Sequence, residues 1–399
     1  MIVKTKMKRF NWIGLESITF AVRPAFMALF SFLVINQDGA KLWGDFVYYL
    51  IGVELIIMLT SWGQKQFLMR NFSVSPNEIN RSWNGAFQIR LLLVITLLLS
   101  VFFWPILESE KPMLLLWITF QFLISLGDAL LPYLRKYKIL LSSELFAALS
   151  GLTVYVVWRP NDIEGLMWIL VLSSAIKAVF TLSVIIKEIK IIPFSLKIIK
   201  GFALPALPFF FLSFIGLIQN KADLYIVSFQ MNESDLALYS IVLSFLILMQ
   251  GVSAVMLRPF EKNIYRLRPS ELSILKKKYL ILGSMLSIIG ATCVFYIVKL
   301  IYGFELNIEA LPMLILYLLP FFFYLIEAHI LLKFNLVYTM IGFAFLGAIA
   351  GSVTTWLLIP LYGIEGALLG GILSRLIVAL FVVLRYRKLP KTSNSFQVT

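Results

Sequence analysis

The segment Gly201-Phe-Ala-Leu-Pro205-Ala-Leu-Pro208 opens the second half of the chain. It begins a long apolar stretch that follows a basic segment starting at Lys187. Proline lacks a backbone N–H and clashes with the preceding helical turn, so a membrane-spanning helix that contains Pro205 and Pro208 must bend. The carbonyl groups released by the bend need partners other than lipid. We therefore expect this helix to face protein or water.

Two charged residues, Lys221 and Asp223, lie further along the same stretch. A charge inside the hydrocarbon layer costs at least a few kcal/mol unless it is paired or hydrated. A bent helix that carries charge is typical of the wall of a transport pathway. The alternative is a proline-kinked packing helix whose charges lie at the outer interface.

The composition indicates a polytopic membrane protein, because 60% of the 399 residues are hydrophobic and only 14% are charged. The net charge of +14 is explained by basic residues in short loops between spans, so we expect no nucleic acid partner. Cys293 is the only cysteine and His329 the only histidine, which excludes a cysteine cluster and a site of several imidazoles. We predict no metal, no cofactor and no enzymatic activity.

Apolar runs of roughly 20 residues predict about twelve transmembrane helices. The first run lacks a signal-peptide cleavage site, so we expect it to remain as a span. Lys and Arg concentrate in alternate connections, including the loop from Arg258 to Lys278, which predicts that both termini are cytoplasmic. The predicted spans are residues 13–35, 46–69, 85–107, 112–131, 139–158, 165–187, 201–229, 236–257, 278–302, 310–332, 336–359 and 364–385.

An internal repeat links the ends of the two halves, since residues 163–180 align without a gap on residues 364–381 and share an Ile-Glu-Gly start. Chance similarity among apolar spans is the alternative. A duplication of six helices gives two lobes of parallel topology, with binding expected between them. We predict an N-terminal six-helix lobe at 1–190, a cytoplasmic linker at 191–200 and a C-terminal lobe with a cytoplasmic tail at 201–399.

Helical rise places Arg23, Lys177 and Arg375 near the middle of the bilayer, with Glu54 close to it. The excess of positive charge suggests an anionic ligand, and Arg and Lys suit phosphate. The alternative is that Glu16, Glu54 or Asp223 neutralises the cations inside a lobe. Other charged residues lie near span ends, where side chains can reach the interface, and are set aside: Glu16, Lys65, Arg90, Asp128, Glu144, Lys299 and Glu327.

Short stretches along the whole chain carry a family resemblance: Leu42-Trp-Gly-Asp-Phe46, Ser61-Trp-Gly63, Leu68-Met-Arg70, Ala203-Leu-Pro205, Asn220-Lys-Ala-Asp223, Leu238-Tyr239, Leu257-Arg-Pro259 and Leu358-Ile-Pro-Leu-Tyr-Gly-Ile-Glu-Gly-Ala367. They resemble polysaccharide flippases of the Wzx type, in the superfamily that also holds MATE drug exporters and lipid II flippases. The resemblance implies alternating access by two six-helix lobes. It also implies charged functional positions at Arg23, Lys221, Asp223 and Arg375.

We therefore expect a flippase that moves an undecaprenyl-diphosphate-linked oligosaccharide across the bacterial inner membrane for surface polysaccharide or O-antigen synthesis. Its expected partners are the lipid-linked substrate, the bilayer, a glycan polymerase and a chain-length regulator. The predicted substrate-binding residues are Arg23, Lys177, Lys221 and Arg375, while Glu54 and Asp223 are candidates for ion coupling or charge balance. The alternatives are a drug or amphiphile exporter, a membrane glycosyltransferase or polymerase, and a scaffold that gathers glycan enzymes.

Overall fold

The computed structural model describes residues 2–62, 64–104, 107–264, 269–334 and 336–389, and no β-strand occurs in these ranges. A 3-10 turn at Pro76–Glu78 and a π-helical turn at Ile297–Ile301 supplement the α-helices. The α-helices are α1 (Ile2–Asp38), α2 (Ala40–Ser61), α3 (Gln64–Val74), α4 (Ile79–Val101), α5 (Lys111–Ser125), α6 (Leu130–Tyr133), α7 (Tyr137–Trp158), α8 (Ile163–Glu188), α9 (Leu196–Gln230), α10 (Glu233–Ile264), α11 (Pro269–Tyr296), α12 (Ala310–Lys333) and α13 (Val337–Arg387).

Ten helices in the described part of the chain are long and apolar enough to cross a membrane, which confirms the all-α polytopic fold class. Helix α13 is counted once among them, although the backbone at Gly363 (φ 56°, ψ −131°) breaks it between the last two predicted spans. The predicted span 46–69 begins and ends too late. Helix α2 starts at Ala40 and ends at Ser61, where Trp62 takes the left-handed conformation (φ 48°).

The chain divides into two compact units, Met1–Phe214 (unit 1) and Ile215–Thr399 (unit 2). The division lies inside α9, later than the predicted linker at 191–200. Helix α9 continues through Pro205 and Pro208. Near the prolines, Trp62 Nε1 donates to the Ala203 carbonyl at 3.1 Å, which ties this part of α9 to α2. The prolines therefore belong to unit 1, and the lobe boundaries at 190 and 201 stay a prediction.

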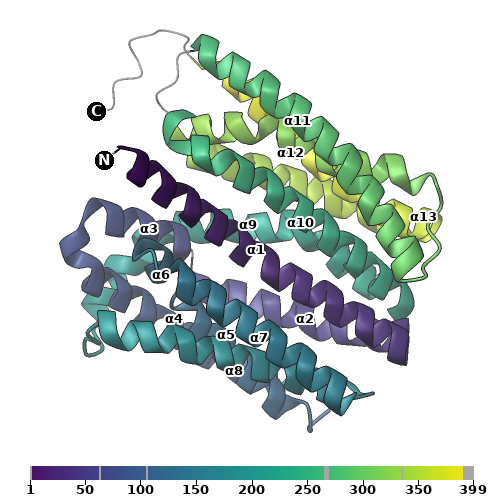
Figure 1. Cartoon of the computed structure of the whole chain (residues 1–399), viewed down its shortest axis with the longest axis horizontal. Coiled ribbons are helices and arrows are strands. Elements are labelled where there is room, and N and C mark those ends of the chain that lie inside the picture. Colours follow the sequence, from purple (N-terminus) through teal and green to yellow (C-terminus); the bar gives the residue numbers. More distant parts are fainter. Residues whose placement is uncertain (1, 63, 105–106, 265–268, 335, 390–399) are drawn as a thin grey trace. The chain divides into compact units, whose positions relative to one another are not determined.

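Within unit 1, α8 packs side by side with α5 and α7, and α1 packs on α7 (Figure 1). Aromatic side chains fill the space between α1, α2, α5 and α7. The Phe30 ring meets Trp43 and Tyr155 edge-on, with centroids 5.8 and 5.5 Å apart, and Phe46 stacks on Trp117 at 6.4 Å. Because lipid tails are as apolar as these side chains, close packing rather than escape from water holds such a core together.

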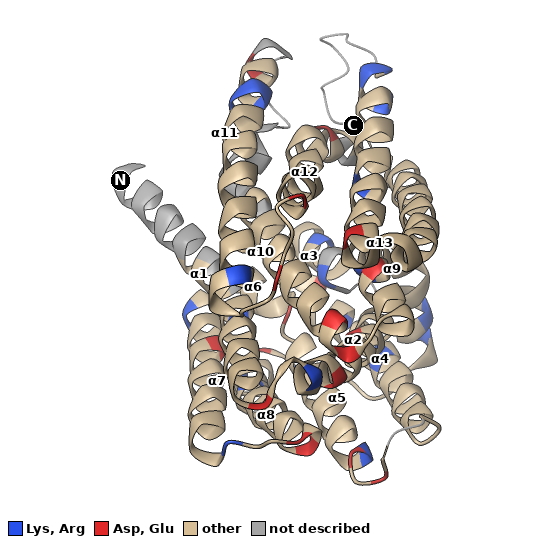
Figure 2. Cartoon of the chain, turned by 90° about the vertical axis from the view of Figure 1, so that its right-hand side faces the viewer, with Lys and Arg blue, Asp and Glu red and all other residues tan. Residues whose placement is uncertain are grey.

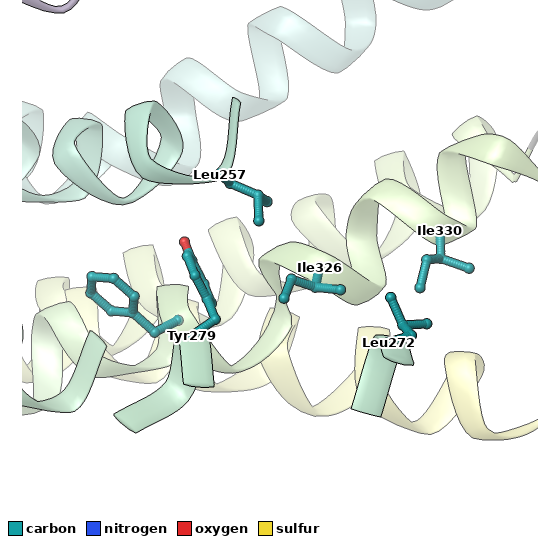
Figure 3. Packing of buried hydrophobic residues seen from close by; sticks show 6 residues of the cluster. Leu257, Leu272, Tyr279, Ile326 and Ile330 are labelled. Carbon is teal, nitrogen blue, oxygen red and sulfur yellow. The ribbon is translucent and has the colours of Figure 1, made fainter. Parts of the chain in front are cut away.

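Within unit 2, α12 packs against α10, α11 and α13. Figure 3 shows one of its apolar clusters, in which Tyr279 and Leu272 of α11 meet Ile326 and Ile330 of α12, with Leu257 of α10 above them. The two parts of α13 pack through small residues. A Cβ on Gly370 would lie 2.0 Å from Thr355 Oγ1, so only glycine allows this approach.

The basic ends of α11 and α13 lie at the same end of unit 2 (Figure 2). Lys276 Nζ in α11 is 5.7 Å from the ring centroid of Tyr386 at the end of α13. The sequence predicts that both ends lie on the cytoplasmic side. Their proximity agrees with a common side, and the side itself stays a prediction.

Candidate functional site

Unit 2 contains a buried polar cluster made by four different helices: Asp223 (α9), Tyr239 (α10), Tyr317 (α12) and Arg375 (α13). No member is more than 4% exposed. The Asp223 carboxylate accepts hydrogen bonds through Oδ2 from the hydroxyl groups of Tyr239 at 2.8 Å and Tyr317 at 3.3 Å. Its Oδ1 accepts from the backbone N–H of Leu224 at 2.8 Å. We call these four residues the Asp223–Arg375 cluster.

Arg375 is held by its own helix and by an aromatic ring. Its Nη1 donates to the Gly371 carbonyl at 2.9 Å, and its Cζ lies 3.7 Å from the centroid of the Tyr317 ring. The Nε and Nη2 groups have no hydrogen-bond partner in the described part of the chain. A fully buried guanidinium normally has its donors satisfied, so this edge is unusual.

Gly371 lets the carboxylate and the guanidinium approach each other. The position of a Cβ at this residue would be 2.5 Å from Tyr317 Cε2, 3.0 Å from Asp223 Oδ2 and 3.3 Å from Arg375 Nη1. Any larger residue would force the Tyr317 ring away. The opposite charges therefore both lie close to this glycine, and burial in low dielectric strengthens their attraction.

Local sequence explains how α9 and α10 present their two members of the cluster. The helices are joined by the tight turn at Met231 and Asn232, and Asn232 Oδ1 accepts from the Asp235 N–H at 2.9 Å as the N-cap of α10. Asp223 and Tyr239 lie about equally far from this turn on adjacent antiparallel helices. The hairpin therefore brings them to the same level.

In unit 1, the predicted cation Lys177 of α8 forms an ion pair with Glu144 of α7 at 2.6 Å, and both side chains are mostly buried. The premise that Lys177 lacks a partner is therefore wrong. The sequence sets Glu144 aside as a residue of a span end, because depth along a helix says nothing about which neighbour the side chain faces. The role of Lys177 in substrate binding stays a prediction.

The sequence also sets Arg90 of α4 aside because its side chain is expected to reach the interface. This reason is wrong, since the side chain is only 1% exposed. Its Nε donates to the Thr60 carbonyl at 3.0 Å, and its Nη2 donates to Ser125 Oγ. The guanidinium lies 5.6 Å from the ring centroid of Phe122. Arg90 thus joins α2, α4 and α5. Glu327 of α12 is likewise 1% exposed and pairs with Lys276 of α11.

The remaining predicted residues divide between the units. Arg23 is exposed on α1. Its positive charge is near enough to interact electrostatically with the Lys177 ammonium group, and so is the negative charge of Asp128. Glu54 and Lys221 are half-buried. The structure thus brings Arg23 near Lys177 in unit 1 and Asp223 near Arg375 in unit 2. Across the described ranges, no group of three or more His, Cys, Asp or Glu side chains could hold a metal ion.

The sequence signal for Arg375 is its position far from any span end, and the signal for Asp223 is a charge within a long apolar stretch that contains two prolines. Tyr239 and Tyr317 give no such signal, because tyrosine is common in apolar helices. The indirect signal for the two tyrosines is the carboxylate of Asp223, because a buried carboxylate needs hydrogen-bond donors nearby.

No family model matches the chain, and no curated protein does. Solved structures do match. The chain is similar to the lipid II flippase MurJ in an inward closed conformation, with a TM-score of 0.62 and 18% sequence identity. This similarity covers 95% of this chain and 88% of that chain.

The chain is also similar to an inward-facing multidrug resistance transporter of the MATE family of the MOP superfamily (TM-score 0.61, 12% identity, 94% and 96% covered). A third similar structure is a mutant of the Vibrio cholerae MATE transporter VcmN (TM-score 0.58, 13% identity, 97% of both chains covered). The chain therefore has the twelve-helix, two-lobe fold that these proteins share.

Proposed function

We propose that this protein is a membrane transporter that works by alternating access and moves an undecaprenyl-diphosphate-linked oligosaccharide across the cytoplasmic membrane. The observation that carries the proposal is the buried Arg375, which keeps two N–H donors without an acceptor in the described part of the chain. One solved protein of the same fold is named a lipid II flippase, which supports a lipid-linked substrate. Sugar and phosphate resist entry into hydrocarbon, so such a substrate needs a protein pathway.

The chemistry of the cluster suits a phosphate ligand. The Nε and Nη2 groups of Arg375 are adjacent donors that can bind two oxygens of one phosphate group. Arg375 is fully buried in this structure, so the proposal requires a second conformation in which that edge is accessible. Arg23 of unit 1, which is exposed, is a further proposed substrate-binding cation. Lys177 would bind substrate only in competition with Glu144, which occupies its ammonium group here.

Asp223 and Glu54 are the proposed coupling or charge-balancing groups. Asp223 is the stronger candidate, because it is 4% exposed, hydrogen-bonded by two hydroxyl groups and close to Arg375. Proton uptake by its carboxylate would weaken its attraction for the guanidinium. Lys221, two residues before it on α9, is the remaining proposed substrate ligand.

The proposed cellular setting follows from the same substrate. We place the protein in the bacterial inner membrane with both termini in the cytoplasm, which the basic connections favour. A glycan polymerase and a chain-length regulator are the proposed functional partners. The proposed role is transport rather than catalysis.

The test measures surface glycan in cells that carry Arg375→Ala, Arg375→Lys or the control Arg81→Ala. Arg81 is an exposed residue paired with Glu78 on the surface of unit 1. We expect Arg375→Ala to lower export at least about tenfold, the value of one charge-assisted hydrogen bond. Arg375→Lys should retain part of the activity because the charge remains but the paired donors are lost.

Membrane abundance is measured in parallel with export. Normal export by Arg375→Ala would refute the assignment of the site. A loss of export that follows a loss of protein in both Arg375 variants would make the residue structural instead.

A multidrug exporter is the second candidate, favoured by the buried carboxylate of Asp223 and by the name of one solved protein of this fold, a multidrug resistance transporter. A carboxylate in a transport pathway attracts organic cations, whereas the donors of Arg375 attract anions. Proteoliposomes that transport an organic cation but leave the lipid-linked glycan unmoved would favour this candidate.

A further inference from the structure

One face of α4 holds the segment that connects α8 to α9. Residues 189–195 lie outside the helices, and Asn80, Asn84 and Gln88 of α4 face them. These three amides are four residues apart, which places them on one side of the helix. Asn84 and Gln88 are buried, with 0% and 3% exposure. We call these three residues the amide clasp.

The first half of the clasp binds alternate residues of the connection. Asn80 Oδ1 accepts from the Lys190 N–H at 3.1 Å, and Asn84 Nδ2 donates to the Lys190 carbonyl at 2.9 Å. Asn84 Oδ1 accepts from the Ile192 N–H at 2.8 Å. One buried side chain thus satisfies both a donor and an acceptor of an extended backbone, as a neighbouring strand would.

Gln88 continues this pattern by one helical turn. Its Nε2 donates to the carbonyls of Ile192 at 3.2 Å and Pro193 at 3.0 Å, and its Oε1 accepts from the Ser195 N–H at 3.1 Å. Pro193 has no N–H of its own to satisfy. The backbone of the connection is therefore paired along most of its length with side chains of unit 1.

The first turns of α9 are fixed to the same unit. A Cβ on Gly85 of α4 would lie 2.9 Å from Phe202 Cβ, so α9 touches α4 at this point. Trp62 Nε1 donates to the Ala203 carbonyl at 3.1 Å, and the Trp62 ring stacks on Phe210 with centroids 4.8 Å apart. These contacts extend the attachment past both prolines.

The division between the two units follows shortly after, between Phe214 and Ile215. Gly216 follows directly, and a Cβ there would meet no atom within 4 Å. Glycine weakens a helix because it leaves more backbone freedom in competing conformations. Helix α9 is therefore locally weak at Gly216, next to the division between the units.

We infer that the connection between α8 and α9 is a fixed part of unit 1, and that the two units move relative to each other about residues 214–216 of α9. The amide clasp removes the freedom that an unpaired linker would have. The position of the joint rests on the alternating access of the proposed function, whereas the amide clasp holds whatever the protein transports.

The first experiment measures amide hydrogen exchange of peptides covering residues 189–195 in lipid nanodiscs. We expect slow exchange in the wild type, and exchange about tenfold faster in Gln88→Ala, which removes three hydrogen bonds to the segment. The control is Gln121→Ala, which removes a half-buried amide that binds Ser174 Oγ instead. If Gln88→Ala does not accumulate, Asn80→Ala removes one bond from an exposed position and should release the Lys190 N–H alone.

Exchange of the wild-type segment at the rate of an unstructured peptide would overturn the clasp. Equal acceleration by Gln121→Ala would do so as well. Neither outcome depends on a transported substrate, so this result and a failure of the proposed function are distinguishable.

The second experiment tests the position of the joint with spin labels in a Cys293→Ala background. Labels at Ser73 and Lys197 both lie in unit 1, whereas labels at Ser73 and Tyr338 lie in different units, and all three positions are exposed. We expect a single narrow distance for the first pair and a broad or two-component distribution for the second. Gly216→Ala should narrow the second distribution.

Gly201→Ala is the matched control, because Gly201 is also a helical residue of α9 with no atom within 4 Å of its Cβ position. It should leave the second distribution unchanged, since it lies in the attached part of the helix. A first pair as broad as the second, or equal effects of the two glycine substitutions, would overturn the proposed joint.

Discussion

Arg375 combines full burial with two donors that no described residue accepts from, and its neighbours explain how the residue is tolerated. The Tyr317 ring covers one face of the guanidinium, Nη1 binds the Gly371 carbonyl, and Asp223 supplies a nearby negative charge. Removing one member of a buried pair of charges usually costs more than removing both. The Asp223–Arg375 cluster should therefore behave as a unit.

For this cluster we predict that Asp223→Asn destabilises the protein by about 3–5 kcal/mol, because it leaves the charge of Arg375 buried without a counter-ion. The double variant Asp223→Asn, Arg375→Met should recover most of this loss and still fail to export glycan. Thermal unfolding of detergent-solubilised protein measures the first effect, and surface glycan measures the second. A double variant that is less stable than Asp223→Asn would show that the two charges do not compensate each other.

The two parts of helix α13 pack against each other. Its two parts meet through glycine and small polar residues, since Gly370 lies against Thr355 and the Gly351 carbonyl. In a membrane, association of helices depends on such close approach because no hydrophobic effect separates a helix from lipid. The bend at Gly363, where φ is 56°, turns the second part back along the first.

For this helix we predict that Gly370→Ala lowers the unfolding temperature, because its Cβ would lie 2.8 Å from the Gly351 carbonyl oxygen and 2.0 Å from Thr355 Oγ1. The control is Gly342→Ala in the same helix, where a Cβ meets nothing within 4 Å. That change should be neutral or stabilising by less than about 1 kcal/mol. Equal effects of both substitutions would mean that packing between the two parts of α13 does not limit stability.

For the whole molecule, the distribution of Lys and Arg predicts the orientation in the membrane. Unit 2 brings the basic ends of α11 and α13 together, as expected for segments on one side. Arg and Lys are retained on the cytoplasmic side during insertion, so these ends should be cytoplasmic.

We predict that single cysteines at Asp38, Glu164 and Glu233, introduced into a Cys293→Ala background, react with an impermeant thiol reagent added outside intact cells. Cysteines at Ser75, Ser195 and Ser270 should react only after the membrane is opened. A cysteine that reacts neither in intact cells nor after the membrane is opened is labelled again after the protein is denatured. The reverse pattern would invert the topology and contradict the cytoplasmic placement of the termini.

The class of fold follows from the sequence alone, because a span of roughly 20 apolar residues is a local property and needs no knowledge of neighbours. Arg375 is also identifiable in this way, since its depth along a helix can be counted, and Asp223 is identifiable as a charge within a long apolar stretch. The packed helices were needed to show that Lys177 pairs with Glu144, that Arg90 is buried, and that two tyrosines bind Asp223. The reason is physical: position along a helix is fixed by the number of residues, whereas the partner of a side chain depends on which helices pack against its face.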